Sequence, residues 1–479
     1  MTELTDFGTA VLVVSAVLFL ALAGMRVADR LAVPYAAIFL LGAVALGELL
    51  PAAERLLSIR EVERIAVVAL IVILFHGGLH IGLGSFRRSA GPILALGVFS
   101  TFATAGLVAL VARYALGFGW VEAGLVGAAI APTDPAVTFS VFGARELRGR
   151  AGLILEGESA VNDPVGIALM VGMIEFATES GSGGFSIVVG EFVRQMAVGL
   201  AVGGASAYAL LPVARRVRLT SASLYPIRVL AAAGIVYGLA TVAGGSGFLA
   251  VFVAGVLLGD AALPRKGEIE SFHASLAGLA EIAVFVALGL SIGLGDLWEL
   301  RVWEDGLALA LALTLLARPL AVLPLLLPVR LRWNERLFIV WGGLKGAVPI
   351  LLGALAVIAG VEGAERLYGI VFVVVLVSVL VQGASLPWGA RRLRLPFVRV
   401  DHDLAEVLEF VVREEAPSCG RRVAELPLAE RAWLSAVIRD GRPLVLHDDL
   451  VLAAGDRVHV YSQPDAAPAL RRIFEGRPT

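Results

Sequence analysis

The chain has 479 residues, of which 58% are hydrophobic and only 17% are charged, and its mean hydropathy is +0.86. This composition is far more apolar than that of an average soluble protein, so we expect a polytopic membrane protein. The formal net charge of −2 leaves no positive surplus for a nucleic-acid partner. The single cysteine, Cys419, excludes a disulfide bond within the chain.

The first residues contain Glu3 and Asp6 but no lysine or arginine before the first apolar run. A secretory signal begins with basic residues, so this run is expected to remain in the protein as a membrane helix. The acidic start also favours an external N-terminus.

About thirteen segments are long and apolar enough to cross a bilayer, which takes roughly 17–25 mainly apolar residues. They are 7–26, 31–50, 63–84, 89–115, 119–142, 151–177, 187–213, 223–243, 245–260, 275–295, 303–329, 335–361 and 366–390. The ninth is short. With an external N-terminus, an odd number of spans places the C-terminus in the cytoplasm.

The charges of the loops support this count. The loops predicted to be cytoplasmic carry Arg26, Arg30, Arg87, Arg88, Arg145, Arg148, Arg150, Arg215, Arg216, Arg218, Arg265, Lys266, Arg330, Arg332, Arg336, Arg391, Arg392 and Arg394. The outer loops hold only Arg55, Arg60, Arg64, Arg113, Arg301 and Arg366. This imbalance follows the positive-inside rule, and an error of one span would spoil the alternation.

From about Phe397 onward, the composition changes to that of a small soluble domain. We therefore expect residues 1–395 to form an all-α transmembrane domain and residues 400–479 to form a small cytoplasmic α+β domain. The predicted elements of the second domain are a helix at Leu404–Arg413, strands at Trp433–Ile438, Leu444–Leu446 and Val458–Tyr461, and a helix at Ala467–Phe474.

The sixth predicted span contains the run L-E-G-E-S-A-V-N-D-P, which begins at Leu155. On a helix, its polar residues Glu158, Ser159, Asn162 and Asp163 fall within an arc of about 140° and form one stripe. Asp163 is expected about 18 Å deep, near the middle of the bilayer. Ionisable groups at that depth are costly and mark a functional site by default.

The fifth span contains A-P-T-D-P-A, with Thr133 and Asp134 between two prolines. Two prolines so close together cannot lie in an unbroken helix. Backbone groups freed at membrane depth are tolerated where they line a cavity, and such broken helices supply ion sites in transporters. Thr133 and Asp134 should lie about as deep as Asp163, so the two spans can meet there.

The twelfth span contains a second interruption, W-G-G-L-K-G-A-V-P, which includes Lys345. We expect the positive charge of Lys345 to neutralise helix-end charge at this break. Its role is opposite in sign to that of Asp134 at the other break. Arg318 in the eleventh span is a further buried charge and a plausible partner for Glu158. Interruptions in the fifth and twelfth spans suit two inverted six-helix repeats with crossed discontinuous helices, as in secondary transporters.

These three motifs together resemble the bacterial cation/proton antiporters of the sodium- and potassium-proton exchanger superfamily. The resemblance covers nearly all of the first 395 residues. It implies that Asp163 holds the cation and the proton in turn, with Thr133, Glu158 and Ser159 in the ion site. We also expect Asp134 and Asn162 among the residues that bind the cation and the proton. Asn162 stands where electrogenic relatives have Asp, which implies electroneutral exchange of one cation for one proton.

The resemblance also implies a pairing of Arg318 with Glu158 or its neighbours. One position departs from the family pattern: Lys345 stands where the motif usually has arginine. Lysine keeps the charge but lacks the forked geometry of a guanidinium, so no bidentate contact is expected from it.

The segment from Gly420 to Phe474 resembles the C-terminal ligand-binding (TrkA-C-like) module of potassium-conductance regulators. In the antiporter family this appendage marks the branch likened to potassium/proton exchangers. It implies regulation, with a small nucleotide as the expected ligand, and dimerisation.

Several residues have simpler interpretations beside the functional one. Glu158 either joins the ion site or only pairs with Arg318, and the simpler interpretation of Glu156 is a charge that lines the entry funnel. His76 and His80 are spaced to face one metal ion, but no third ligand is evident nearby, so a packed histidine pair is favoured.

The expected function is exchange of a monovalent cation, with potassium favoured over sodium, for a proton in the bacterial inner membrane, without a cofactor. The expected partners are lipids and a second copy of the chain. A gated potassium channel is a rival, but the chain lacks a T-V-G-Y-G filter. A hydrolase using Ser159 is another, but no histidine lies near it in sequence, and Gly157-Glu-Ser159 is not a nucleophile elbow.

Overall fold

The computed structural model describes residues 33–49, 57–134, 145–147, 150–178, 186–299, 302–395, 397–399, 406–426, 428, 432–439, 441–462 and 467–476, with scattered helical positions between 8 and 24. The chain forms two compact units, one of residues 1–143 and 147–397 and the other of residues 144–146 and 398–479. Each unit is described separately below.

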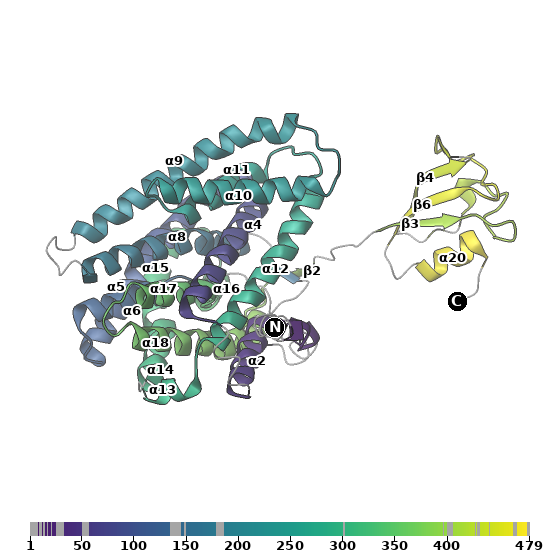
Figure 1. The fold of residues 1–479 in the computed structure, drawn as a ribbon. Helices are drawn as coiled ribbons and strands as arrows, with labels where there is room; N and C mark the ends of the chain where they lie inside the picture. The colour runs from purple at the N-terminus through teal and green to yellow at the C-terminus, as the bar shows by residue number, and fades with distance from the viewer. Residues whose placement is uncertain are drawn as a thin grey trace. The chain divides into compact units, whose positions relative to one another are not determined.

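The first unit is built from helices (Figure 1). Its α-helices are α2 (Tyr35–Leu49), α4 (Ile59–Leu94), α5 (Thr101–Ala115), α6 (Trp120–Ile130), α8 (Arg150–Thr178), α9 (Ser186–Arg216), α10 (Leu224–Val242), α11 (Gly247–Gly259), α12 (Lys266–Leu290), α13 (Leu294–Glu299), α14 (Val302–Ala312), α15 (Arg318–Leu326), α16 (Trp333–Trp341), α17 (Ala347–Ile358), α18 (Ala364–Val377) and α19 (Ala384–Arg392). In the described part of the unit, some of these helices are joined by the π-helical segments η1 (Ala95–Ser100), η2 (Leu313–Ala317) and η3 (Ser378–Gly383).

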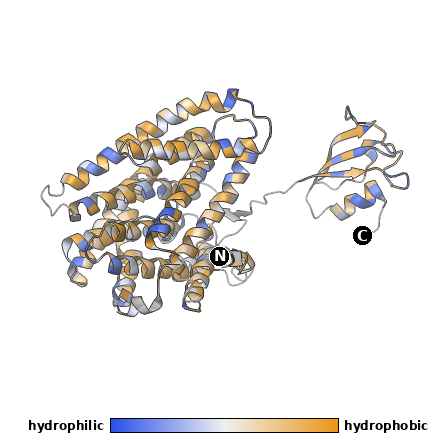
Figure 2. Ribbon diagram, in the orientation of Figure 1, coloured by the Kyte–Doolittle hydropathy of each residue, from blue (hydrophilic) through white to orange (hydrophobic). Residues whose placement is uncertain are grey.

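The helices of this unit have the length and composition of membrane spans. Among the described residues, seven helices are long and apolar enough to cross a membrane, and four shorter apolar helices accompany them. Figure 2 shows apolar residues along most of their length. The expected polytopic helical fold is therefore confirmed. Each predicted segment from 31–50 onward overlaps at least one helix, whereas half of the positions of 7–26 lie outside the described residues.

The long helix α4 is interrupted between the third and fourth predicted spans. Gly82 has φ 64° and ψ 161°, and Ser89 also leaves the helical region. A side chain at Gly82 would collide with the carboxylate of Asp260, which accepts a hydrogen bond from the Gly84 amide at 2.5 Å. Only glycine combines this positive φ with such a close approach, so it determines where the two spans separate.

The second unit contains a four-stranded antiparallel sheet in the order β3-β6-β4-β5 and a helix (Figure 1). Its core consists of alternate residues of β6, such as Val458 and Val460, with Phe410, Leu470 and Phe474. The expected small domain containing both strands and a helix is confirmed. Its elements are β3 (Glu406–Val411), β4 (Trp433–Arg439), β5 (Arg442–Leu444), β6 (Arg457–Ser462) and α20 (Ala467–Glu475); β1 (Arg145–Leu147) and β2 (Phe397–Arg399) form a separate two-stranded sheet.

Two predicted elements of this unit differ from the structure. The first is the helix expected at Leu404–Arg413, since Glu406–Val411 form strand β3. Phe410 and Val412 are buried while Glu409 and Val411 are exposed, which is the two-residue period of a strand. The strand pairs with β6 along its whole length, with Phe410 opposite Val458. This long-range pairing outweighs the local helix preference. The strand expected at Leu444–Leu446 is also misplaced, because β5 ends at Leu444.

Candidate functional site

The two interrupted spans meet at their breaks. Helix α6 ends at Ile130, and the chain is non-helical through Asp134; helix α16 ends at Trp341, and α17 begins only at Ala347. The backbone amide of Asp134 donates a hydrogen bond of 2.8 Å to the carbonyl oxygen of Leu344. The two non-helical segments are therefore in direct contact inside the bundle.

At each break, a charged side chain interacts with the helix end at the other break. The ammonium group of Lys345 donates to the carbonyl oxygens of Ala131 (2.7 Å) and Pro132 (2.8 Å), which follow the C-terminal end of α6. The carboxylate of Asp134 accepts from the amide of Ala347 at 3.2 Å, at the start of α17. A cation at a helix C-terminus and an anion at an N-terminus both interact favourably with the helix dipole.

The expectation for Lys345 therefore needs a correction. Its side chain neutralises the end of the fifth-span helix, not a helix end at its own break. An ammonium group has three donors and needs no forked geometry to hold two carbonyl oxygens, so lysine suits this position. Side chains at Gly343 and Gly346 would collide with Arg318 and Asp134, which explains the glycines of the twelfth-span motif.

A closed set of hydrogen bonds joins the fifth span to α8. The Asn162 amide nitrogen donates to the Thr133 hydroxyl at 2.8 Å, and the Asn162 amide oxygen accepts from the Thr133 backbone amide at 3.3 Å. The hydroxyls of Thr133 and Ser159 are 2.9 Å apart and share a hydrogen bond. All three side chains are buried. The structure thus brings together the predicted residues Thr133, Ser159 and Asn162.

Asp163 lies next to this polar cluster and differs from its members. Its side chain is 5% exposed, and its Oδ1 atom has no hydrogen-bond partner among the described residues. Asp134 and Lys345 are both close enough to interact with it electrostatically. A buried carboxylate oxygen without a partner is costly, so this atom is the part of the cluster best placed to take a cation or a proton.

Glu158 forms a buried ion pair with an arginine. Its two carboxylate oxygens accept from the Arg318 guanidinium at 2.9 and 3.3 Å, and both side chains are buried. Arg318 also donates to the carbonyl oxygens of Val340 (2.9 Å) and Ile339 (3.1 Å) near the end of α16. This geometry favours the arginine-partner role of Glu158 over direct membership of an ion site.

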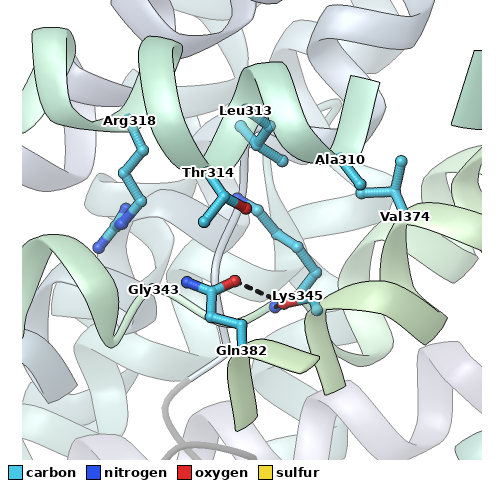
Figure 3. A pocket seen from close by; sticks show the side chains of 9 residues that line it. Ala310, Leu313, Thr314, Arg318, Gly343, Lys345, Val374 and Gln382 are labelled. Carbon is cyan, nitrogen blue, oxygen red and sulfur yellow. Dashed lines mark hydrogen bonds between the residues drawn. The ribbon is translucent and has the colours of Figure 1, made fainter. Parts of the chain in front are cut away.

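A polar network in the last span supports the break between α16 and α17. The Lys345 amide donates to Ser378 Oγ at 2.9 Å, Ser378 donates to Gln382 at 3.2 Å, and the Gln382 amide donates to the Trp341 carbonyl at 2.5 Å. Figure 3 shows Gln382 on one side of a small cavity that Lys345 and Ser378 also line, with Thr314 and Arg318 on the other side. The network therefore ties together both ends of the non-helical segment.

Sequence reasoning missed several residues. Ser378 and Gln382 are polar residues four apart in the largely apolar predicted span 366–390, and that spacing could have identified them. Glu281 is a carboxylate within the predicted span 275–295 and lies close enough to Asp134 to interact with it electrostatically. The cost of a charge in a span was the available signal for Glu281.

The contact between the breaks of the fifth and twelfth spans is called the crossing below. The other residues that the sequence singled out lie outside it. His80 Nε2 is 3.9 Å from the carboxylate of Glu156, and the rings of His76 and His80 are 6.3 Å apart. Among the described residues, no group of three His, Cys, Asp or Glu side chains could hold a metal ion. Cys419 is a free, partly buried thiol in the second unit.

Comparison with known proteins gives two family matches. The transmembrane sodium/hydrogen exchanger family matches residues 16–392, and the TrkA-C domain matches residues 407–475. The sequence is 32% identical over 466 residues to the K(+)/H(+) antiporter NhaP2 of Shewanella sp. (strain ANA-3), covering 94% of this chain and 81% of that protein. It is 30% identical to the K(+)/H(+) antiporter NhaP of Alkalimonas amylolytica, covering 97% and 83%.

A solved structure shares the fold. The sodium proton antiporter MjNhaP1 from Methanocaldococcus jannaschii, determined at pH 8, superposes with a TM-score of 0.67 at 24% sequence identity. The match covers 80% of this chain and 100% of that one.

Proposed function

The chain belongs to the sodium/hydrogen exchanger family, and we propose that it is a secondary transporter that exchanges a monovalent cation for a proton across the membrane. The resemblance seen in the three sequence motifs is confirmed by the family matches. The observation that carries the proposal is the buried Asp163 carboxylate, whose Oδ1 has no partner among the described residues. The exchange needs no cofactor, because one carboxylate can hold either ion.

Competition for Asp163 is sufficient for exchange. In its charged form the carboxylate attracts a cation, and the hydroxyl oxygens of Thr133 and Ser159 are the neighbouring neutral ligands. A proton on Asp163 removes the charge that holds the cation. Alternating exposure of this one site to the two sides then couples the two ion movements in opposite directions.

The charge balance of the crossing supports electroneutral exchange. Glu158 is compensated by Arg318, and the single charges of Asp134 and Lys345 balance each other. Among the described carboxylates near the two breaks, Asp163 and Glu281 then remain, and with Glu281 neutral the one negative charge left is that of Asp163. Asn162 is neutral and is used to hold Thr133. A site with one surplus charge takes one monovalent cation or one proton, so each cycle moves no net charge.

Potassium is the proposed cation. The support comes from the names of the relatives in Shewanella and Alkalimonas and from the TrkA-C match beyond the membrane unit. Sodium is the alternative of the same class. It has its own support in the Na(+)/H(+) antiporter NhaG of Bacillus atrophaeus, which is 28% identical over 349 residues.

We propose thirteen spans in two inverted six-helix repeats, with the N-terminus outside and the C-terminus in the cytoplasm of a bacterial inner membrane. The contact between the breaks of the fifth and twelfth spans supports the repeats, and the loop arginines support the orientation. Residues 400–479 would then form a cytoplasmic regulatory domain. A small nucleotide is its proposed ligand, and the proposed assembly is a homodimer.

The test is proton flux in everted vesicles from cells without other antiporters. Asp163→Asn is expected to abolish cation-dependent proton movement at unchanged expression, because the amide cannot bind a proton in exchange for the cation. Glu156→Gln, one polar change two turns earlier on the same helix, is the matched control and should retain exchange. Undiminished exchange by Asp163→Asn would contradict the assignment of Asp163 as the residue that binds the cation and the proton.

A further inference from the structure

A second cavity lies away from the crossing, at one end of the membrane unit. Its volume is about 520 Å³, and it is an open hollow bordered by the end of α4 with η1, the start of α8, and the end of α15 with the chain that follows it. Pro92, Ala95, Leu325 and Val329 provide apolar walls. The proposed function makes no use of this cavity.

Two arginines stand at its rim. Arg150 begins α8, Arg330 lies just beyond the end of α15, and both side chains are exposed. Within the described part of the chain, neither forms a hydrogen bond or an ion pair. No acidic residue is among the described residues that line the cavity, so its two guanidinium groups repel each other and favour an anion between them. Phosphate is an anion that guanidinium groups bind well, through paired hydrogen bonds.

Charge and apolar surface occur together where the helices end. This is the end that the loop arginines predict to be cytoplasmic, where anionic lipid headgroups meet basic pockets between helices. We propose that the cavity binds an anionic phospholipid, with the phosphate between Arg150 and Arg330 and an acyl chain along Leu325 and Val329. A free phosphate ion would use the arginines but not the apolar walls.

The lipid would touch the elements that hold the buried ion pair. A Cβ added at Gly97 in η1 would lie 2.5 Å from Val161 and 3.3 Å from the backbone oxygen of Glu158, so η1 packs tightly on α8. Arg318 is the first residue of α15. A lipid that joins η1, α8 and α15 is therefore expected to stabilise the membrane unit and, if the proposed function holds, to raise exchange.

The test uses the purified full-length chain in detergent, with Tm measured against added phosphatidylglycerol, phosphatidylcholine or inorganic phosphate. Phosphatidylglycerol should raise Tm far more than the other two. The double variant Arg150→Gln/Arg330→Gln should weaken this effect by about tenfold or more in lipid concentration, as the loss of charge-assisted hydrogen bonds implies. Arg215→Gln/Arg216→Gln, at the exposed end of α9, is the matched control and should keep the full effect.

A second variant separates the lipid from a free anion. Ala95→Phe fills the apolar part of the cavity and leaves both arginines in place, so it should abolish the phosphatidylglycerol effect. An undiminished effect in the arginine double variant would overturn the proposal. So would a phosphate effect equal to that of the lipid and insensitive to Ala95→Phe. The Asp163→Asn variant should bind the lipid as the original chain does. A failure of the lipid proposal would therefore not contradict the exchange mechanism proposed for Asp163.

Discussion

Replacing Arg318 by methionine is expected to leave the carboxylate of Glu158 buried without its counter-ion. The two side chains are 3% and 0% exposed, and they share hydrogen bonds of 2.9 and 3.3 Å. The same change also removes the donors to the carbonyl oxygens of Ile339 and Val340 at the end of α16. Methionine preserves most of the side-chain volume, so the effect isolates the charge and its hydrogen bonds.

The loss can be sized from the burial. Removing one partner of a fully buried ion pair costs about 3–5 kcal/mol, because the remaining charge stays desolvated. Buried carbonyl groups left without donors add about 1–3 kcal/mol. Replacing both partners, as in Glu158→Gln/Arg318→Met, removes the stranded charge and should recover about half of the loss or more.

The assay is unfolding of the purified chain by titration with sodium dodecyl sulfate in mild-detergent micelles. Arg194→Met serves as the control, since Arg194 pairs with Glu191 at 2.7 Å but is 58% exposed, and should lose only about 0–1 kcal/mol. If Arg318→Met costs no more than Arg194→Met, or if the double variant is less stable than Arg318→Met, the reasoning about the buried pair fails.

Two further predictions follow from the polar network and from the second unit. Gln382→Leu should lower the maximal exchange rate severalfold, since it leaves the Trp341 carbonyl without its donor and the Ser378 hydroxyl without its acceptor; vesicle flux measures the change. For Asp456, burial disfavours the charged form, but hydrogen bonds from Arg439 and the Ala453 amide outweigh it and hold the pKa below its usual 3.8. The ionised carboxylate of Asp456 therefore stabilises the folded unit fully at pH values above the usual pKa of 3.8. This stabilisation is lost as the pH falls through the lower pKa of the folded state. The urea midpoint for pepsin cleavage of the second unit should fall between pH 5 and pH 3, and Asp456→Asn should flatten that fall; an equally steep fall in the variant would contradict the assignment.

The polar residues of the crossing were predictable because each is costly in a membrane. Asp163, Asp134 and Arg318 stand out in apolar spans, and prolines or glycines mark the two breaks. Periodicity alone placed Ser159 and Asn162 on the face of Asp163. These signals are local in sequence and follow from the energetics of burying charge.

What the sequence left open depends on long-range geometry. Lys345 reaches carbonyl groups more than 200 positions earlier in the chain, and nothing near Lys345 in sequence indicates that. The choice between the two roles of Glu158 needed the distance to Arg318. Strand β3 was mistaken for a helix because its conformation is determined by pairing with β6, about fifty residues later. The segment around Ser378 is π-helical for reasons that a hydrophobic pattern does not reveal.

The central claim is that Asp163 exchanges one monovalent cation for one proton. The most direct measurement records internal pH and membrane potential together in proteoliposomes with an outward potassium gradient. The predicted result is proton uptake that follows the gradient, develops no membrane potential, and is absent in Asp163→Asn. Proton uptake accompanied by a potential, or uptake that persists in Asp163→Asn, would contradict it.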